Sequence, residues 1–204
     1  MAASVSSPAD VVNLALARIG YKLRISDLYD GSAPAKVALT VYAQTRDELL
    51  SDGNWEFAER NTPGVLLKQA PVGGYIPPTV WTSAYPALPW MYSYQFPSDA
   101  LKVRAVKTTP LFGFNPDPQA QLYSIDNDNG FAPPQRVVLC NLANAIIVYT
   151  GQVTDPTTWD VAFVEAMAAA VGRRMAPQLV GLDGAKLAAS DEQVEGQIAR
   201  MTQE

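Results

Sequence analysis

The sequence contains no histidine and only one cysteine, and both shortages limit the chemistry that the chain can perform. Without histidine, the usual general base, the base of a catalytic triad and the commonest zinc ligand are all missing. The lone Cys140 excludes an intrachain disulfide and a thiolate metal site, and its apolar surroundings, VVLCNLA, predict a buried and inert thiol. We therefore expect no catalytic residue, no metal site and no cofactor.

Basic residues and long apolar runs are also scarce. The chain has 15 Lys and Arg against 20 Asp and Glu, a net charge of -5 at pH 7. This balance disfavours a groove that clamps phosphates, although an acidic surface suits DNA that must slide past without sticking. No apolar run could span a bilayer, and the start MAASVSSPAD lacks the basic and apolar regions of a signal peptide. We expect folding in the cytosol and no membrane contact.

Two helices are predicted in the first 60 of the 204 residues. Ser7 and Ser32 are suitable N-caps for helices over 8–19 and 34–52, because each hydroxyl precedes a proline that fits a first turn. Gly53 is expected to end the second helix in a left-handed conformation. The second helix is expected to bury Ala38, Val41, Tyr42, Thr45 and Leu49 on one face. After it, Trp55 and Phe57 are expected to plug the core.

The end of the chain returns to helical patterns. From Asp155 to Pro177 apolar residues cover more than half of the helix circumference, and several Ala and Gly residues would allow close approach of neighbouring helices. Asp155 and Thr157 can cap this helix, and Arg173 and Arg174 suit its last turn. Residues 182–201 form a weaker pattern with a narrow apolar stripe. It either docks on the protein's own core or, as we favour, extends to a partner. The stripe consists of Leu187, Val194, Ile198 and Met201.

Residues 61–89 are rich in Pro and Gly, so no helix and no long strand is expected there. A loop of this length in a compact domain is unusual and points to an interaction role or to ordering by a partner. The loop either forms an interaction arm or wraps its own domain. The aromatic and apolar residues that could make a contact are Val80, Trp81, Tyr85 and Trp90.

Five short strands with turn signals between them follow the loop and indicate a small antiparallel sheet or barrel. They are expected at 91–96, 101–107, 122–125, 136–139 and 145–150. The acidic run Asp126–Gly130 is reminiscent of a calcium loop, which also needs a distal bidentate carboxylate, and no Glu follows at that place. We interpret it as a turn.

These segments predict an α+β protein: a helical bundle of about four helices with an inserted small antiparallel β-sheet or barrel. The bundle is expected to be discontinuous, over 1–60 and 151–204. The Pro-rich loop or arm would occupy 61–90, and the β insertion 91–150.

Four blocks in this order resemble the head-to-tail adaptors of tailed bacteriophages, specifically the tail tubular protein A type of short-tailed phages. The blocks are ALARIG at 15–20, RDELLSDGNWEFAER at 46–60, YSYQFPSDALKVRAV at 92–106 and VYTGQVTDPTTWDVAFVEAMAAAVGRRMA at 148–176. The resemblance spans about residues 10–200. The strongest marker is RDELL followed by W-x-F-A, and the loop at 61–89 departs from the pattern by its excess of Pro and aromatic residues.

The resemblance implies a structural virion protein that is not an enzyme, assembled in the host cytoplasm and located at the head-tail interface. Its copies would form a homo-oligomeric ring, a dodecamer, between the portal protein and the tail nozzle or tail tube. Double-stranded DNA would pass through the lumen during genome ejection without specific binding. The C-terminal stripe from Leu187 to Met201 would bind the portal, and the residues from Val80 to Trp90 would contact the tail side or a neighbouring subunit.

Two other classes of function compete with this reading. A phage-tail cell-wall hydrolase needs two carboxylates facing each other across a cleft. The candidates Asp47, Glu48, Asp52 and Glu56 lie on or near the solvent side of the second helix, which favours solvated charge. A nucleic-acid-binding module could use Trp81, Tyr85, Trp90 and Tyr92 as stacking platforms. No Lys or Arg lies between Gln69 and Leu101 to supply the basic groove that such sites need.

Overall fold

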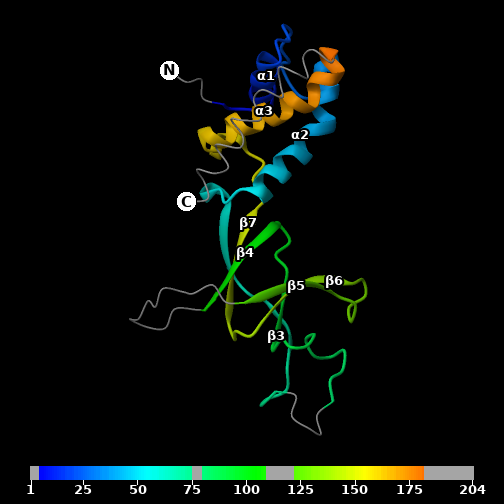
Figure 1. Cartoon of the computed structure of the whole chain (residues 1–204), viewed down its shortest axis with the longest axis vertical. Helices are drawn as coiled ribbons and strands as arrows, with labels where there is room; N and C mark the ends of the chain where they lie inside the picture. Colours follow the sequence, from blue (N-terminus) through cyan, green and yellow to red (C-terminus); the bar gives the residue numbers. More distant parts are fainter. Residues whose placement is uncertain (1–4, 75–79, 109–121, 182–204) are drawn as a thin grey trace, which may run out of the picture. The chain divides into compact units, whose positions relative to one another are not determined.

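The computed structural model describes residues 5–74, 80–108 and 122–181, and the chain divides into two compact units (Figure 1). The helical unit comprises Met1–Ala58 and Gln152–Glu204, and the β unit comprises Glu59–Gly151. The chain therefore leaves the helical unit once and returns to it once. In the described ranges, no helix combines the length and apolar character that a membrane crossing requires.

Three α-helices form the described part of the helical unit: α1 (Pro8–Arg18), α2 (Ala33–Asp52) and α3 (Val161–Leu179). The two predicted N-caps are confirmed. The Ser7 hydroxyl accepts a hydrogen bond from the Asp10 amide, and the Ser32 hydroxyl accepts one from the Ala35 amide. The residue before α3 is Asp160, whereas Asp155 caps the short 3-10 turn η2 (Pro156–Thr158).

Helix α3 packs against both α1 and α2 (Figure 1). Gly172 permits the close approach to α1, because a Cβ at this position would lie 3.1 Å from the Ala15 carbonyl oxygen. An ion pair links Arg18 of α1 to Glu165 of α3, and another links Arg174 of α3 to Glu48 of α2. The close approach of a neighbouring helix that the small residues of α3 predict is therefore observed, and the neighbouring helix is α1.

A cluster of four aromatic rings fills the core beside α3. Phe163 is fully buried, and its ring centroid lies 5.0 Å from that of Trp55, 5.2 Å from Phe57 and 4.9 Å from Trp159. All three pairs are edge-to-face or close to it, the arrangement that aromatic quadrupoles favour. The packing role expected for Trp55 and Phe57 is confirmed.

Two local expectations in this unit are wrong, and a third holds only in part, because Ala38, Tyr42 and Thr45 of the expected α2 face are buried and its other two members are not. Gly53 has a φ of -94°, outside the left-handed region, and it is needed because a Cβ there would lie 2.4 Å from Nε1 of Trp55. Helix α3 also continues through Pro177 to Leu179. The buried face of α2 is rotated from the expected one, with Val41 and Leu49 only half-buried. The buried positions of α2 are Pro34, Ala35, Ala38, Tyr42, Thr45, Arg46 and Leu50.

The described part of the β unit contains seven strands in two antiparallel sheets (Figure 1). The order is β1-β7-β4 in the first sheet and β2-β3-β6-β5 in the second. A 3-10 turn, η1 (Glu56–Ala58), precedes the first strand. The strands are β1 (Glu59–Pro63), β2 (Leu66–Gln69), β3 (Tyr92–Gln95), β4 (Ala100–Thr108), β5 (Tyr123–Asp128), β6 (Gln135–Cys140) and β7 (Ala145–Gly151).

One hydrophobic core joins the two sheets. Its buried members are Tyr94, Val138 and Cys140 from the four-stranded sheet, Val103, Val106, Ala145, Ile147 and Tyr149 from the three-stranded sheet. The Cys140 side chain is completely buried, and this burial raises the pKa of its thiol. The expectation of a buried thiol is confirmed.

The prediction of a bundle of about four helices with one small sheet or barrel is wrong. The described residues form three α-helices and two antiparallel sheets, a mixed α+β fold. The fourth helix expected over 182–201 lies outside the described residues. The five expected strands are all present, but β1 and β2 add two more in the segment that was expected to be a loop. These strands form because β7 and β3, distant in sequence, supply their pairing partners.

Candidate interaction site

Residues 80–90 form a series of turns held by their own hydrogen bonds. The Tyr85 amide donates to the Thr82 carbonyl at 3.0 Å, and the Trp90 amide donates to the Ala87 carbonyl at 3.0 Å. The Trp81 indole Nε1 donates to the Pro86 carbonyl at 2.7 Å, so its polar edge is satisfied inside the segment while 44% of the residue stays exposed. We call residues 80–90 the aromatic segment.

Lys68 on β2 ties the aromatic segment to the four-stranded sheet. Its Nζ lies 2.5 Å from Oδ2 of Asp128 on β5 and donates to the Ser83 carbonyl at 2.8 Å. The same ammonium lies 4.8 Å from the ring centroid of Phe131. Only 10% of the Lys68 side chain is exposed, so these contacts replace much of its lost hydration. One buried cation therefore joins β2, the aromatic segment and the β5–β6 hairpin.

Gly130, in the β5–β6 turn, makes room for this cation. A Cβ at this position would lie 2.7 Å from the Lys68 Nζ and 3.0 Å from Oδ1 of Asp128. The Gly130 amide also donates to Oδ1 of Asp128 at 2.8 Å, which fixes the carboxylate for Lys68. The turn and the ion pair thus depend on each other.

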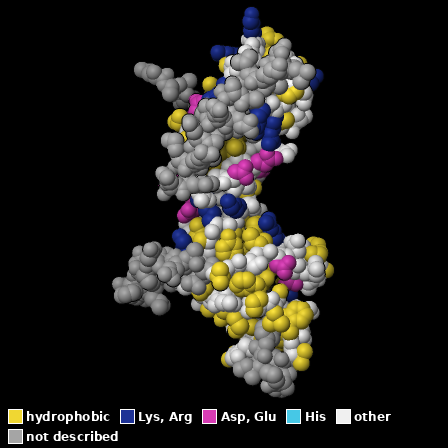
Figure 2. Space-filling model, in the orientation of Figure 1, with side chains coloured by type: hydrophobic (Ala, Val, Ile, Leu, Met, Phe, Trp, Pro, Cys, Tyr) yellow, Lys and Arg dark blue, Asp and Glu magenta, His cyan; other side chains and the backbone are white. Residues whose placement is uncertain are grey.

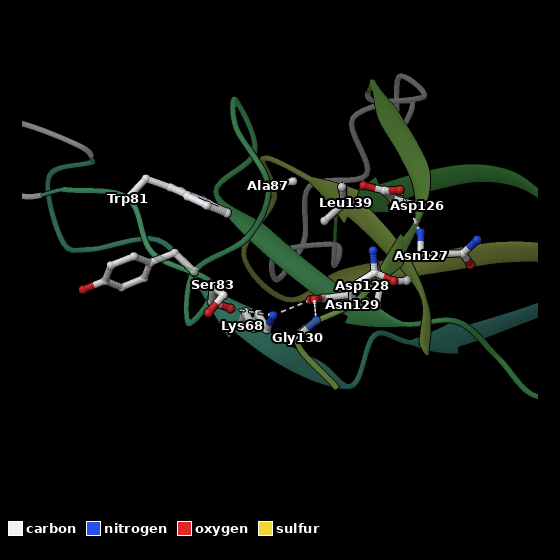
Figure 3. Close-up of a pocket in the computed structure, with 12 residues that line it drawn as sticks. Lys68, Trp81, Ser83, Ala87, Asp126, Asn127, Asp128, Asn129, Gly130 and Leu139 are labelled. Atoms are coloured by element: carbon white, nitrogen blue, oxygen red, sulfur yellow. Dashed lines mark hydrogen bonds and ion pairs between the residues drawn. The ribbon is translucent and has the colours of Figure 1, made fainter. Parts of the chain in front are cut away.

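These elements enclose a pocket of about 370 Å³ (Figure 3). Its lining combines apolar and aromatic side chains, from Trp81, Tyr85, Ala87, Val137 and Leu139, with polar residues, namely Lys68, Ser83, Asp126, Asn127, Asp128, Asn129 and Gly130. Lys68 and Asp128 neutralise each other, and Oδ1 of Asp126 accepts a hydrogen bond from the Asn127 amide.

The acidic run Asp126–Gly130 is part of this hairpin. Asp126 to Asp128 belong to strand β5, and Asn129 and Gly130 turn the chain toward β6. One oxygen of Asp128 is committed to Lys68 and the other to the Gly130 amide. Across the ranges that the structure describes, no group of three or more His, Cys, Asp or Glu side chains could hold a metal ion.

The β unit also carries exposed large apolar side chains. Val72 is fully exposed and Val80 is 75% exposed, and Figure 2 shows hydrophobic side chains gathered over this unit on the face in view. Among the described residues between positions 65 and 88, the exposed large apolar side chains are those of Val65, Leu66, Val72, Val80, Trp81 and Leu88. Such a concentration is typical of a surface that meets another protein.

The residues expected to contact a tail-side partner or a neighbouring subunit have different places in this site. Trp81 and Tyr85 both line the pocket, Val80 lies exposed at the start of the aromatic segment, and Trp90 is half-buried outside the pocket lining. The stripe from Leu187 to Met201, expected to bind the portal, lies outside the described residues. Lys68 was not among the predicted site residues, because its partner Asp128 lies 60 residues further along the chain and leaves no local signal in the sequence.

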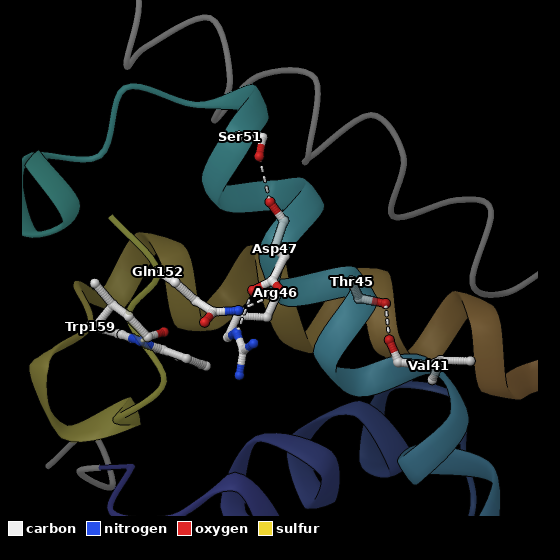
Figure 4. A network of polar contacts seen from close by, with 8 residues as sticks. Val41, Thr45, Arg46, Asp47, Ser51, Gln152 and Trp159 are labelled. Atoms are coloured by element: carbon white, nitrogen blue, oxygen red, sulfur yellow. Dashed lines mark hydrogen bonds and ion pairs between the residues drawn. The ribbon is translucent and has the colours of Figure 1, made fainter. Parts of the chain in front are cut away.

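Two of the four acidic residues considered for hydrolysis, Asp47 and Glu48, are held in ion pairs. Asp47 accepts from Arg46 Nε at 2.8 Å and from Gln152 Nε2 at 2.8 Å, which joins α2 to the returning chain (Figure 4). Glu48 pairs with Arg174, and hydrogen bonds from this Arg and from Gln44 lower the pKa of Glu48. A glycosidase acid needs a raised pKa, so Glu48 has the opposite electrostatic setting.

Comparison with known proteins adds no relative. No protein-family model matches the sequence, and no curated protein is similar enough to count as a match.

Proposed function

We propose that this protein is a head-to-tail adaptor of a tailed bacteriophage, a structural virion protein whose copies form a ring between portal and tail. DNA passes through the ring lumen without specific binding. The observation that carries this proposal is the apolar surface of the β unit, where the aromatic segment is held against the four-stranded sheet beside a pocket. A ring subunit needs such a surface for its neighbours or for the tail.

The residues of the resembling blocks have scaffold roles, which supports a resemblance in architecture. In the FPSD block, Asp99 forms an ion pair with Arg60, and its other oxygen accepts from the Tyr149 hydroxyl at 3.0 Å. Trp55 and Phe163 come from two blocks and pack ring against ring in the helical core. The blocks thus fall on residues that stabilise the two units, and the contact surface comes from the segment between them.

The test is the mass of the full-length protein in solution, alone and after mixing with a candidate portal ring, by light scattering on a sizing column. The wild type should join the portal as a stoichiometric ring complex of high mass. Val80→Asp should weaken this complex at least about tenfold, since a carboxylate would be buried at an apolar contact.

Val161→Asp is the matched control, because Val161 is 74% exposed on the helical unit and Val80 is 75% exposed on the β unit. This variant should assemble like the wild type. A wild-type protein that stays monomeric and never joins the portal would overturn the adaptor function. If Val80→Asp and Val161→Asp assemble equally well, the aromatic segment is not part of the contact.

A further inference from the structure

Arg136, at the start of β6, places its guanidinium over an aromatic ring. Its Cζ lies 4.2 Å from the ring centroid of Phe96, and the Phe96 amide donates to the Arg136 carbonyl at 3.3 Å. Phe96 in turn packs against the core between the two sheets. The guanidinium therefore has a fixed platform, and its N–H groups lose less conformational entropy when they bind an anion.

A shallow cavity of about 380 Å³ surrounds this platform at the turn between β3 and β4. It is lined by Gln95, Phe96, Pro97, Ser98, Ala100, Gln135 and Arg136. The hydroxyl of Ser98 and the carboxamides of Gln95 and Gln135 supply neutral hydrogen-bonding groups around the cation. We call this cavity the Arg136 shelf.

Arg136 differs from the other arginines of the β unit in having no acidic partner. Arg60 pairs with Asp99, and Arg104 pairs with Glu59. Within the described ranges, the Arg136 side chain makes no ion pair and no hydrogen bond, and its guanidinium lies over the Phe96 ring. An exposed, preorganised fork with no internal partner is suited to an external carboxylate.

The opposite charge lies on the other unit of the protein. The helical unit has 9 Lys and Arg against 15 Asp and Glu, a net charge of -6, and the β unit has 6 against 5, a net charge of +1. Asp52 at the end of α2 and Glu56 in η1 are both exposed, and in the described part of the chain neither makes an ion pair or a hydrogen bond. Two unpaired carboxylates thus lie four residues apart.

We propose that the Arg136 shelf binds an acidic side chain, Asp52 or Glu56, from the helical unit of a neighbouring copy of this chain. This inference rests on the proposed ring and names the chemistry of one contact within it. The contact joins two different surfaces, as a head-to-tail interface requires, and rotation about a central axis would close it into a ring. A single guanidinium on the shelf matches one carboxylate, whereas a DNA backbone would require clustered cations.

The experiment measures assembly of the full-length chain by light scattering, alone and on the portal ring, at low and high salt. Arg136→Glu should weaken assembly at least about tenfold, because two carboxylates would then face each other. Arg136→Lys keeps the charge but loses the planar fork and should give an intermediate loss. Lys102→Glu is the matched control, since Lys102 is an exposed and unpaired cation of the same unit, and it should assemble like the wild type.

A chain that carries Arg136→Glu together with Asp52→Arg and Glu56→Arg should recover assembly, because the charges at the contact are then exchanged. Circular dichroism on each variant verifies that it is folded. Wild-type assembly by Arg136→Glu, or the absence of recovery in the triple variant, overturns this inference and leaves the adaptor function intact. Failure of the wild type to assemble even on the portal overturns both. If Arg136→Glu assembles like the wild type but no longer binds a 20-base-pair DNA duplex, the Arg136 shelf binds a DNA phosphate instead of a carboxylate, which also overturns this inference.

Discussion

Asp10 organises the first turn of α1 through one carboxylate oxygen. Its Oδ2 accepts from the amide and the hydroxyl of both Ser6 and Ser7, at 2.9 to 3.0 Å. The Ser7 hydroxyl also accepts from the Asp10 amide at 3.2 Å, which completes a reciprocal cap. Hydrogen bonds from Ser6 and Ser7 lower the pKa of the Asp10 carboxyl in the folded state.

This cap predicts a pH-dependent stability difference. Asp10→Ala should reduce the free energy of unfolding at pH 7 by about 1 kcal/mol or less, because the carboxylate is partly screened by water. A folded pKa below the unfolded value of about 3.9 means that the stabilisation is present above that pH and is lost as the pH falls through the folded pKa. Urea unfolding at pH 7, 5, 3 and 2 measures the effect, and a difference that grows toward acid pH would contradict it.

At the residue scale, the sequence predicts features that depend on neighbours along the chain. Ser7 and Ser32 could be identified as N-caps because a cap is decided within a few residues. The role of Gly53 could not be predicted, because it follows from where the Trp55 ring lies. Trp81 and Tyr85 could be nominated as contact residues from their composition, but the pocket that they line also needs Lys68 and the β5–β6 hairpin. Long-range pairing of this kind leaves no local pattern.

The aromatic cluster around Phe163 anchors α3 in the core of the helical unit. Phe163 is the member of the cluster that touches the other three rings. Phe163→Ala should therefore lower the free energy of unfolding by about 3–5 kcal/mol through lost burial and a cavity. Val161→Ala, two residues earlier on the same helix at a 74% exposed position, should change it by about 0.5 kcal/mol at most. Urea denaturation of both variants measures the difference, and similar losses would show that the cluster does not anchor α3.

Strands were predictable where the alternation of side chains matches a buried face. In β4, Val103 is buried while its neighbour Lys102 is exposed, as local alternation predicts. Val106, which strict alternation would place on the face of Lys102, is buried as well, and the register with β7 shifts between Val103 and Ala105. Strand β1, ERNTP, has no buried face and ends in Pro63. Proline is tolerated there because β1 is an edge strand of its sheet. The register with β7, from Glu59 opposite Thr150 to Pro63 opposite Ile146, makes this segment a strand.

At the scale of the whole molecule, the β unit is an insertion whose two ends lie side by side. Glu59 at the start of β1 pairs with Thr150 near the end of β7, and the next residue of the chain after Gly151 belongs again to the helical unit. Each unit also has a core of its own: the cluster between the two sheets in one, and the rings around Phe163 in the other. A unit with adjacent ends and a complete core can fold as a separate chain.

A fragment of residues 59–151 should therefore unfold in a single cooperative transition, followed by circular dichroism during heating. The matched control is a fragment of residues 91–150, the β insertion expected from the sequence, which lacks β1 and β2. This shorter fragment loses one edge strand from each sheet and with it the hydrogen bonds to β7 and β3, so it should show no cooperative transition at 25 °C or above. If fragment 91–150 unfolds cooperatively with the same midpoint temperature as fragment 59–151, β1 and β2 do not contribute to the stability of the β unit. Loss of cooperativity in that fragment alone would place the boundary of the unit at Glu59, where the chain leaves η1.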